Sequence, residues 1–316
     1  GSELAVDAVL LIAEHGEYPN NEKGQKLYPR YEFFTEITDV FRASGRSVPV
    51  FNDKHLSYSF GKAQRMVAVA EELLFPLLAG SSLPVTFRLP PLELPLECEI
   101  EDALMIGVGG SDAMDYHALE AMQCMLERRR GGETGIAAVQ LIDGDEVWRA
   151  GEDGRWSRRL LEGALARSDS RSGIALTDGR PQDLAHNDEL QELVENPSAY
   201  FIEYNDGTRA TLLLLNGAVS DWTFAAQVGG EVCSTQFLLP PQPNVTYSAC
   251  LMAKAEEMFA SGVAPYPVQR TLLVCGMLER CLESRVGGHV RLATPELDVC
   301  YRAQEISQFC GASFLR

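Results

Sequence analysis

The sequence has few basic residues, no long apolar run and no closely spaced cysteine pair. Its 27 lysines and arginines stand against 45 aspartates and glutamates, which gives a formal net charge of −18. Such a charge repels nucleic acid phosphates and anionic lipid surfaces. No run reaches the roughly 18 apolar residues of a membrane span, and the first residues lack the basic region and cleavage site of a signal peptide. We expect a cytoplasmic protein whose partner is a small molecule, with no nucleic acid and no membrane.

The eight cysteines lie mostly inside apolar runs such as LLVCGML, and none forms a C-x-x-C pair. Buried free thiols in a reducing compartment show this pattern. The sequence therefore predicts free cysteines and no structural zinc cluster.

The sequence also lacks G-x-G-x-x-G, the turn that brings backbone amides close to the pyrophosphate of a dinucleotide. The nearest match is GVGGSD, in which Asp112 stands where the third glycine belongs. This segment runs from a predicted strand into a predicted helix. Gly107, Gly109 and Gly110 therefore remain a rival cradle for a cofactor.

The first 90 residues alternate between apolar strand patterns and helical patterns. Strands are predicted over 5–13, 47–52 and 75–82, and helices over 28–45 and 57–74. This order predicts a parallel βαβαβ unit with right-handed crossovers. In such sheets functional groups collect at the carboxyl ends of the strands, which here carry Glu14-His15, Asp53-Lys54-His55 and Ser81.

The proline-rich segment 83–97 interrupts this pattern and marks the predicted domain boundary. Beyond it we expect helices over 113–130, 245–261 and 267–285, and hairpin turns at Asp143-Gly144 and Asn205-Asp206-Gly207. The predicted fold class is α/β. Residues 1–90 form a partial Rossmann-like parallel βαβαβ unit, and residues 91–316 form an α+β domain with a mostly antiparallel open sheet.

Two motifs carry a resemblance to a known family. The order VDAVLLIA, helix, VPVFNDKHL, helix, PLLAGSS resembles the second half of the nucleotide-binding domain in the glucose-fructose oxidoreductase and inositol dehydrogenase family. One strand of that family ends in Glu-Lys-Pro, where this chain has Asp53-Lys54-His55. The family also has a histidine early on a helix of the second domain, which His117 matches. The family's aspartate four residues earlier is replaced here by Ala113.

The resemblance implies an NAD(P)-dependent oxidoreductase that acts on a sugar-like or cyclic-polyol substrate. Lys54 and His117 would be the catalytic residues at the reacting carbon. His117 would take the hydroxyl proton, and Lys54 would donate a hydrogen bond to the same oxygen. The expected substrate-binding residues are Glu14, His15, Asp53, His55, Ser81, Asp112 and Glu120. Lys54 would also contact the cofactor, NAD or NADP, if the native protein has the missing first half of the domain; otherwise no cofactor is expected.

Several alternatives remain open. Lys54 could be a solvated strand end and His117 an ordinary helix residue. The chain could be a cofactor-free binding or assembly protein on the same scaffold. It could also be a metal-dependent hydrolase, lyase or isomerase that uses Glu14, His15, His55 and His117, although no H-x-H or H-E-x-x-H motif is present. The long polar loop within 13–34 could be a lid, a binding loop or a tolerated insertion.

The run from Leu212 to Leu215 bears on assembly. Consecutive leucines in a strand point to opposite faces of the sheet. One face can pack on helices of the chain, and the other would leave a large exposed apolar patch. The sequence therefore predicts a homodimer or tetramer through the C-terminal sheet, unless the late helices cover the second face.

Overall fold

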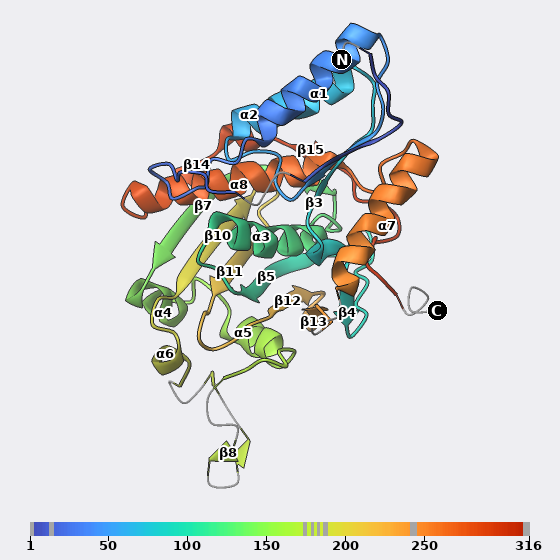
Figure 1. The fold of residues 1–316 in the computed structure, drawn as a ribbon. Coiled ribbons are helices and arrows are strands. Elements are labelled where there is room, and N and C mark those ends of the chain that lie inside the picture. The colour runs from blue at the N-terminus through green and yellow to red at the C-terminus, as the bar shows by residue number, and fades with distance from the viewer. Residues whose placement is uncertain are drawn as a thin grey trace.

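A computed structural model describes most of the chain, and Figure 1 shows its arrangement. The described residues are 3–12, 16–172, 176–177, 180–181, 184–185, 189–240 and 245–311. Two sheets organise these residues. A small parallel sheet holds the N-terminal strands, and a large mixed sheet holds most of the others.

The small sheet has the order β1-β2-β3 and both of its strand pairs are parallel. Its elements are β1 (Val9–Leu11), α1 (Arg30–Ser44), β2 (Val50–Asp53), α2 (Phe60–Glu72) and β3 (Leu77–Gly80). The predicted βαβαβ unit is therefore confirmed.

Local sequence explains where α1 ends and which face it buries. Phe34 and Phe41 lie on one face of α1 and pack against Phe75, with ring centroids 6.1 and 5.3 Å away. Gly45 follows the helix with φ 62°, a left-handed conformation that glycine adopts without steric cost. The apolar stripe and the glycine together fix the position of α1 on the sheet.

The large sheet has eight strands in the order β14-β7-β10-β11-β5-β12-β13-β4. Only the β11–β5 pair is parallel, so the sheet is mostly antiparallel, as predicted. Its strands are β4 (Phe87–Leu89), β5 (Ile100–Gly107), β7 (Ile136–Asp143), β10 (Ser198–Tyr204), β11 (Arg209–Leu214), β12 (Trp222–Val228), β13 (Glu231–Leu238) and β14 (Leu292–Ala293). Two small pairs join β6 (Glu133–Thr134) to β15 (Cys300–Tyr301) and β8 (Leu176–Thr177) to β9 (Arg180–Pro181).

Helices lie on both faces of the large sheet (Figure 1). One face carries α3 (Asp112–Leu126) and α8 (Val268–Val286), and α7 (Thr246–Ser261) packs beside the short 3₁₀ turn Leu83–Val85. The other face carries α4 (Asp145–Glu152) and α5 (Arg158–Leu165), with α6 (Glu189–Leu193) nearby. A second 3₁₀ turn, Pro295–Leu297, packs on β7. Because α8 also contacts α2 and β3, it links the two sheets.

The covered second face overturns the argument for assembly through this sheet. Leu212 and Leu214 belong to the core between the sheet and α3 and α8, whereas Leu213 and Leu215 pack with residues of α4 and α5. All four leucines are buried. The apolar patch that was expected to drive a homodimer or tetramer is therefore covered by the chain's own helices α4 and α5. The helices expected to offer such cover were the later ones, α7 and α8.

The hairpin prediction at Asp143-Gly144 is wrong, and this error explains the missed helices. Gly144 turns the chain with φ 66°, and α4 begins at the next residue. Asp145 and Glu146 occupy its first turn, where carboxylates are favoured by the helix dipole. The hairpin at Asn205-Asp206-Gly207 is confirmed, because it joins the antiparallel strands β10 and β11.

The cysteine prediction is also wrong in part. Cys250 in α7 and Cys310 near the C-terminus form a disulfide. The other six cysteines are free, and three of these are buried: Cys124, Cys275 and Cys281. Two segments distant in sequence meet at Cys250 and Cys310, since Cys310 pairs with Phe87 beside the large sheet. In the described part of the chain, no helix has the length and apolar character to cross a membrane.

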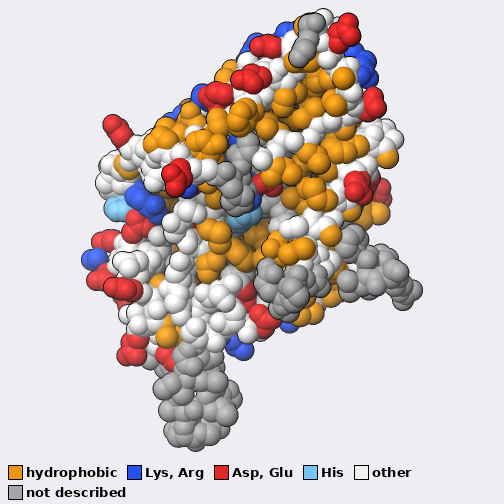
Figure 2. Space-filling model, in the orientation of Figure 1, with side chains coloured by type: hydrophobic (Ala, Val, Ile, Leu, Met, Phe, Trp, Pro, Cys, Tyr) orange, Lys and Arg blue, Asp and Glu red, His pale blue; other side chains and the backbone are white. Residues whose placement is uncertain are grey.

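The outer edge of the small sheet is apolar and partly open. Among the described residues β1 pairs only with β2, so its other edge is free. Leu10 on this strand is 51% exposed, and Ile12, directly after the strand, is 56% exposed. Figure 2 shows apolar side chains gathered on this side of the molecule.

Candidate functional site

The carboxyl end of β2 presents Asp53, Lys54 and His55 as predicted. Lys54 has φ 57°, an uncommon conformation for a residue with a side chain, and its N–H donates a hydrogen bond of 2.9 Å to the Gly80 carbonyl. Its ammonium lies 3.2 Å from the Asp53 carboxylate. Both side chains are largely buried. The backbone hydrogen bond between Lys54 and Gly80 joins the end of β2 to the end of β3.

His55 occupies the place of proline in the resembling family, and it is buried with only 2% exposure. The Arg30 guanidinium donates a hydrogen bond of 2.8 Å to its Nε2. Burial, followed by the positive charges of Arg30, Lys54 and His117, lowers the pKa of His55 well below 6.5. His55 is therefore a neutral acceptor, and Lys54 and His117 both lie within electrostatic reach of it.

His117 lies in the second turn of α3, next to a buried aromatic contact. Its neighbour Tyr116 packs against the His55 ring, with centroids 5.4 Å apart. The helix starts where the sequence indicates, because the Ser111 hydroxyl accepts a hydrogen bond from the Met114 N–H. This start sets the rotation of α3 that directs its second turn toward the end of β2. His117 itself is partly buried.

Ser81 and Glu120 also meet, but inside the protein. The Ser81 N–H donates a hydrogen bond of 2.8 Å to the Glu120 carboxylate, which is fully buried. Burial raises the pKa of Glu120 to about 7, and hydrogen bonds from Ser81 and the charge of Arg270 oppose the rise. Gly80 has φ 142°, and a Cβ there would collide with the Glu120 carboxylate. The pair holds β3 against α3.

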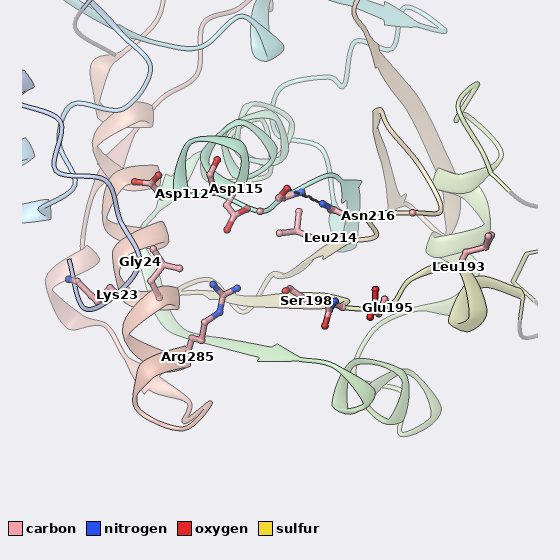
Figure 3. A pocket seen from close by; sticks show the side chains of 16 residues that line it. Lys23, Gly24, Asp112, Asp115, Leu193, Glu195, Ser198, Leu214, Asn216 and Arg285 are labelled. Atoms are coloured by element: carbon pink, nitrogen blue, oxygen red, sulfur yellow. Dashed lines mark hydrogen bonds between the residues drawn. The ribbon is translucent and has the colours of Figure 1, made fainter. Parts of the chain in front are cut away.

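A cavity of about 650 Å³ opens at the N-terminal end of α3. Figure 3 shows the Asp115 carboxylate pointing into it from α3 and the Arg285 guanidinium pointing toward it from α8. The lining residues come from five parts of the chain: Lys23, Gly24, Gly109, Gly110, Ser111, Asp112, Asp115, Leu193, Glu195, Asn196, Ser198, Leu214, Asn216, Gly217, Leu282 and Arg285.

Among the described residues, Asp112 is the predicted substrate-binding residue that lines this cavity, together with Gly109 and Gly110 of the rival cradle. Its Oδ2 accepts a hydrogen bond of 3.2 Å from the Lys26 N–H, which fastens the polar loop after β1 to the start of α3. Burial raises the pKa of Asp112, and backbone hydrogen bonds from Lys26 and Ala113 oppose the rise.

Sequence reasoning did not select Asp115 or Arg285. Burial raises the pKa of Asp115 to about 6, while a 2.5 Å hydrogen bond from the Tyr200 hydroxyl and the charge of Arg285 lower it. The signal for Asp115 was a carboxylate in the first turn of a helix that follows a glycine turn. Arg285 had no local signal, because only the packing of α8 brings it to the cavity.

The predicted residues thus fall into three groups. Asp53, Lys54 and His55 lie together at the end of β2, and the charge of His117 acts on His55. Ser81 and Glu120 form a buried pair. Asp112 lines the cavity. At roughly 100° per residue, His117 points roughly 160° away from Asp115 around α3, and neither Lys54 nor His117 lines the cavity. Glu14 and His15 lie outside the described residues.

The described residues offer no group of three His, Cys, Asp or Glu side chains suited to a metal ion. His55 is buried against the Arg30 guanidinium, which disfavours a cation at its Nε2. The described part of the chain therefore gives no support to the metal-dependent alternative.

The described part of the chain also offers no binding site for a dinucleotide pyrophosphate. The turn from β5 into α3 has the strand–turn–helix form of such a cradle, but Asp112 and Asp115 place two carboxylates in the first turn of the helix. Negative charge there repels phosphate. The segment between β1 and α1 has no glycine fingerprint either. The residues present do not fit the pyrophosphate.

No protein-family model matches the sequence, and no curated protein matches it. Solved structures do. GenD2 from gentamicin A biosynthesis, in complex with NAD, is 13% identical, with a TM-score of 0.54 over 91% of this chain and 78% of that chain. Myo-inositol 2-dehydrogenase from Lactobacillus plantarum is 11% identical, with a TM-score of 0.52 over 92% and 81%. A probable dehydrogenase from Thermotoga maritima is 10% identical, with a TM-score of 0.52 over 94% and 82%.

The chain has the inositol dehydrogenase fold. The likeness extends over nearly the whole chain and includes both sheets, so the predicted resemblance is confirmed at the level of the fold. At 10–13% identity it concerns the fold alone and carries no residue roles.

Proposed function

We propose that the protein is an oxidoreductase of sugar-like or cyclic-polyol substrates that uses NAD or NADP, with Lys54 and His117 at the reacting carbon. One observation carries the proposal: Lys54, directly after β2, and His117 in α3 both influence the charge state of buried His55 at the carboxyl end of a parallel sheet. The shared fold supports it, since structures with this fold include a myo-inositol dehydrogenase in complex with NAD(H) and myo-inositol.

In this proposal the chain's own residues handle the substrate hydroxyl. His117 takes the hydroxyl proton as general base, and the Lys54 ammonium donates a hydrogen bond to the oxygen as it becomes negative. Asp53 holds the ammonium in place through their ion pair. His55 stays neutral because its pKa is far below 6.5, so it does not compete for the proton. The nicotinamide, when bound, would accept the hydride.

Cofactor use is proposed on one condition. The pyrophosphate needs a glycine fingerprint, and the free edge of β1 is where further parallel strands carrying one could join the small sheet. Leu10 in β1 and Ile12 directly after it are exposed, and strands added at that edge would help to cover them. Without such strands, the second candidate function is a polyol-binding protein without redox activity. The two carboxylates in the first turn of α3 favour this second function, because they repel the phosphates of a cofactor.

Turnover with added cofactor tests the proposal. The protein is incubated with millimolar NAD or NADP and a panel of cyclitols and aldoses, and the oxidised sugar is measured directly. Formation of a keto product from at least one polyol is expected where a glycine fingerprint completes the sheet. Polyol binding without any product would favour the cofactor-free protein, and absence of both binding and product would contradict both functions.

A further inference from the structure

The cavity at the start of α3 offers a ligand three carboxylates, those of Asp112, Asp115 and Glu195. Six of its lining side chains carry donor groups, and four of these already donate to a named partner. These pairs are Lys23 with Glu279 and Glu283, Ser198 and Arg285 with Asp143, and Asn216 with the Gly109 carbonyl. A ligand that binds to the carboxylates of the lining must therefore bring donors of its own.

Asp115 is the acceptor best placed for such a ligand. It is only 4% exposed, and its Oδ2 accepts the Tyr200 hydroxyl at 2.5 Å. Its Oδ1 is buried and has no donor in good hydrogen-bond geometry among the described residues, although the nearby Gly110 amide favours its charged form. Figure 3 shows this carboxylate directed into the cavity. A buried carboxylate oxygen without a donor is costly unless a ligand supplies one.

The charges of the lining point to a cation. In the described part of the chain, no lysine or arginine forms an ion pair with Asp112, Asp115 or Glu195. The two lining cations, Lys23 and Arg285, are themselves paired with carboxylates. Although a helix N-terminus usually attracts anions, the carboxylates in the first turn of α3 reverse that preference here.

We infer that this cavity binds a small polyhydroxylated molecule that carries a protonated amine, an amino sugar or an aminocyclitol, with its ammonium at Asp115. An ammonium supplies three donors and a positive charge that can lie directly against the Asp115 carboxylate. Glu195 at the mouth and Asp112 on the wall accept hydroxyl groups. The volume of about 650 Å³ lies within the range of small-ligand sites. The inference goes beyond the proposed function, because Lys54 and His117 do not line this cavity.

Isothermal titration with glucosamine, N-acetylglucosamine and glucose tests the inference. These sugars share a ring and differ in the charge of one substituent. Glucosamine is expected to bind at least about tenfold more tightly than the other two, as a charge-assisted hydrogen bond to a buried carboxylate implies. Inorganic phosphate should not bind or displace it.

Variants locate the ammonium. Asp115→Asn keeps an oxygen for the Tyr200 hydroxyl and removes the charge, so it should weaken glucosamine binding about tenfold or more. Glu195→Gln should weaken it less, and Glu152→Gln, an exposed carboxylate on α4 outside the cavity, should leave it unchanged. Circular dichroism confirms that each variant is folded.

Three outcomes would overturn the inference: equal affinity for all three sugars, phosphate binding in place of glucosamine, or an Asp115→Asn variant that binds glucosamine as before. Absence of binding by any sugar would overturn it too. Lys54→Met separates this inference from the proposed function. It should leave glucosamine binding intact even if it abolishes oxidation, and loss of glucosamine binding in that variant would contradict a distinct site.

Discussion

The Arg30 guanidinium donates a 2.8 Å hydrogen bond to Nε2 of His55 in the interior of the protein, at the point where β2 ends. Arg30 is itself fully buried at the start of α1. A buried guanidinium needs acceptors, because removing its partner leaves an uncompensated charge. The pair therefore joins α1 to the strand end that carries Lys54.

Replacing His55 tests this pair. His55→Phe keeps a ring of similar shape but removes the acceptor, so the free energy of unfolding should fall by about 2–4 kcal/mol. His55→Gln keeps an acceptor and should cost less. Urea unfolding of the two variants measures the difference. Equal losses would mean that the ring's packing matters and the hydrogen bond does not.

Glu120 should make stability depend on pH. The folded state holds its proton up to about pH 7, whereas the unfolded chain releases it near 4.5. Between these values the folded state binds more protons, so its stability falls as pH rises. Glu120→Gln removes this titration and keeps an oxygen for the Ser81 N–H. At roughly 1.4 kcal/mol per pKa unit, the variant should gain up to about 3 kcal/mol relative to the wild type at pH 8.

The same comparison at pH 4 supplies the control, because Glu120 is then protonated in both states and the gain should vanish. Urea unfolding at the two pH values gives both numbers. A gain or loss of the same size at pH 4 and pH 8 would show that Glu120 does not titrate as described.

Leu213 should matter for folding and not for assembly. It is buried on the face of the large sheet that α5 covers. Leu213→Ala should lower the free energy of unfolding by about 2–5 kcal/mol, as expected for a buried leucine. Light scattering should show the same molar mass for the variant and the wild type. A fall in molar mass without a loss of stability would restore the sheet-to-sheet interface.

The 316-residue chain should bind dinucleotides weakly. The turn from β5 into α3 has Asp112 in place of the third glycine, and its carboxylate repels phosphate. Titration calorimetry should show no saturable NAD binding in the micromolar range. Asp112→Gly removes that charge and serves as the comparison. Micromolar binding by the wild type would instead support Gly107, Gly109 and Gly110 as the cradle.

Sequence patterns predicted the elements whose periodicity is local. β1 to β3, α1 to α3, α7 and α8 all appear close to their expected ranges, because each carries an apolar stripe or a short apolar run. α4 was missed because Asp143-Gly144 has hairpin chemistry, and only the acidic first turn after it marks a helix start. That single error hid the helices that cover the second face of the sheet.

The site was predicted less completely, for a physical reason. Lys54 and His55 are neighbours in sequence at a strand end, where the topology of a parallel sheet indicates function. The residues that line the cavity are up to 262 positions apart in the sequence, from Lys23 to Arg285. No local sequence pattern predicts that such distant segments lie close together in the fold. The Cys250–Cys310 disulfide likewise depends on where α7 and the last residues pack.

The central claim is that a polyol binds with its reacting hydroxyl between Lys54 and His117. Nuclear magnetic resonance of the protein with isotope-labelled histidine measures it directly, because the chain has only five histidines. During titration with myo-inositol or another bound polyol, the side-chain signals of His117 should shift and those of His289 should not. The shift should be lost in Lys54→Met and kept in Lys62→Met. A polyol that saturates the protein while the His117 signals stay unchanged would contradict the account.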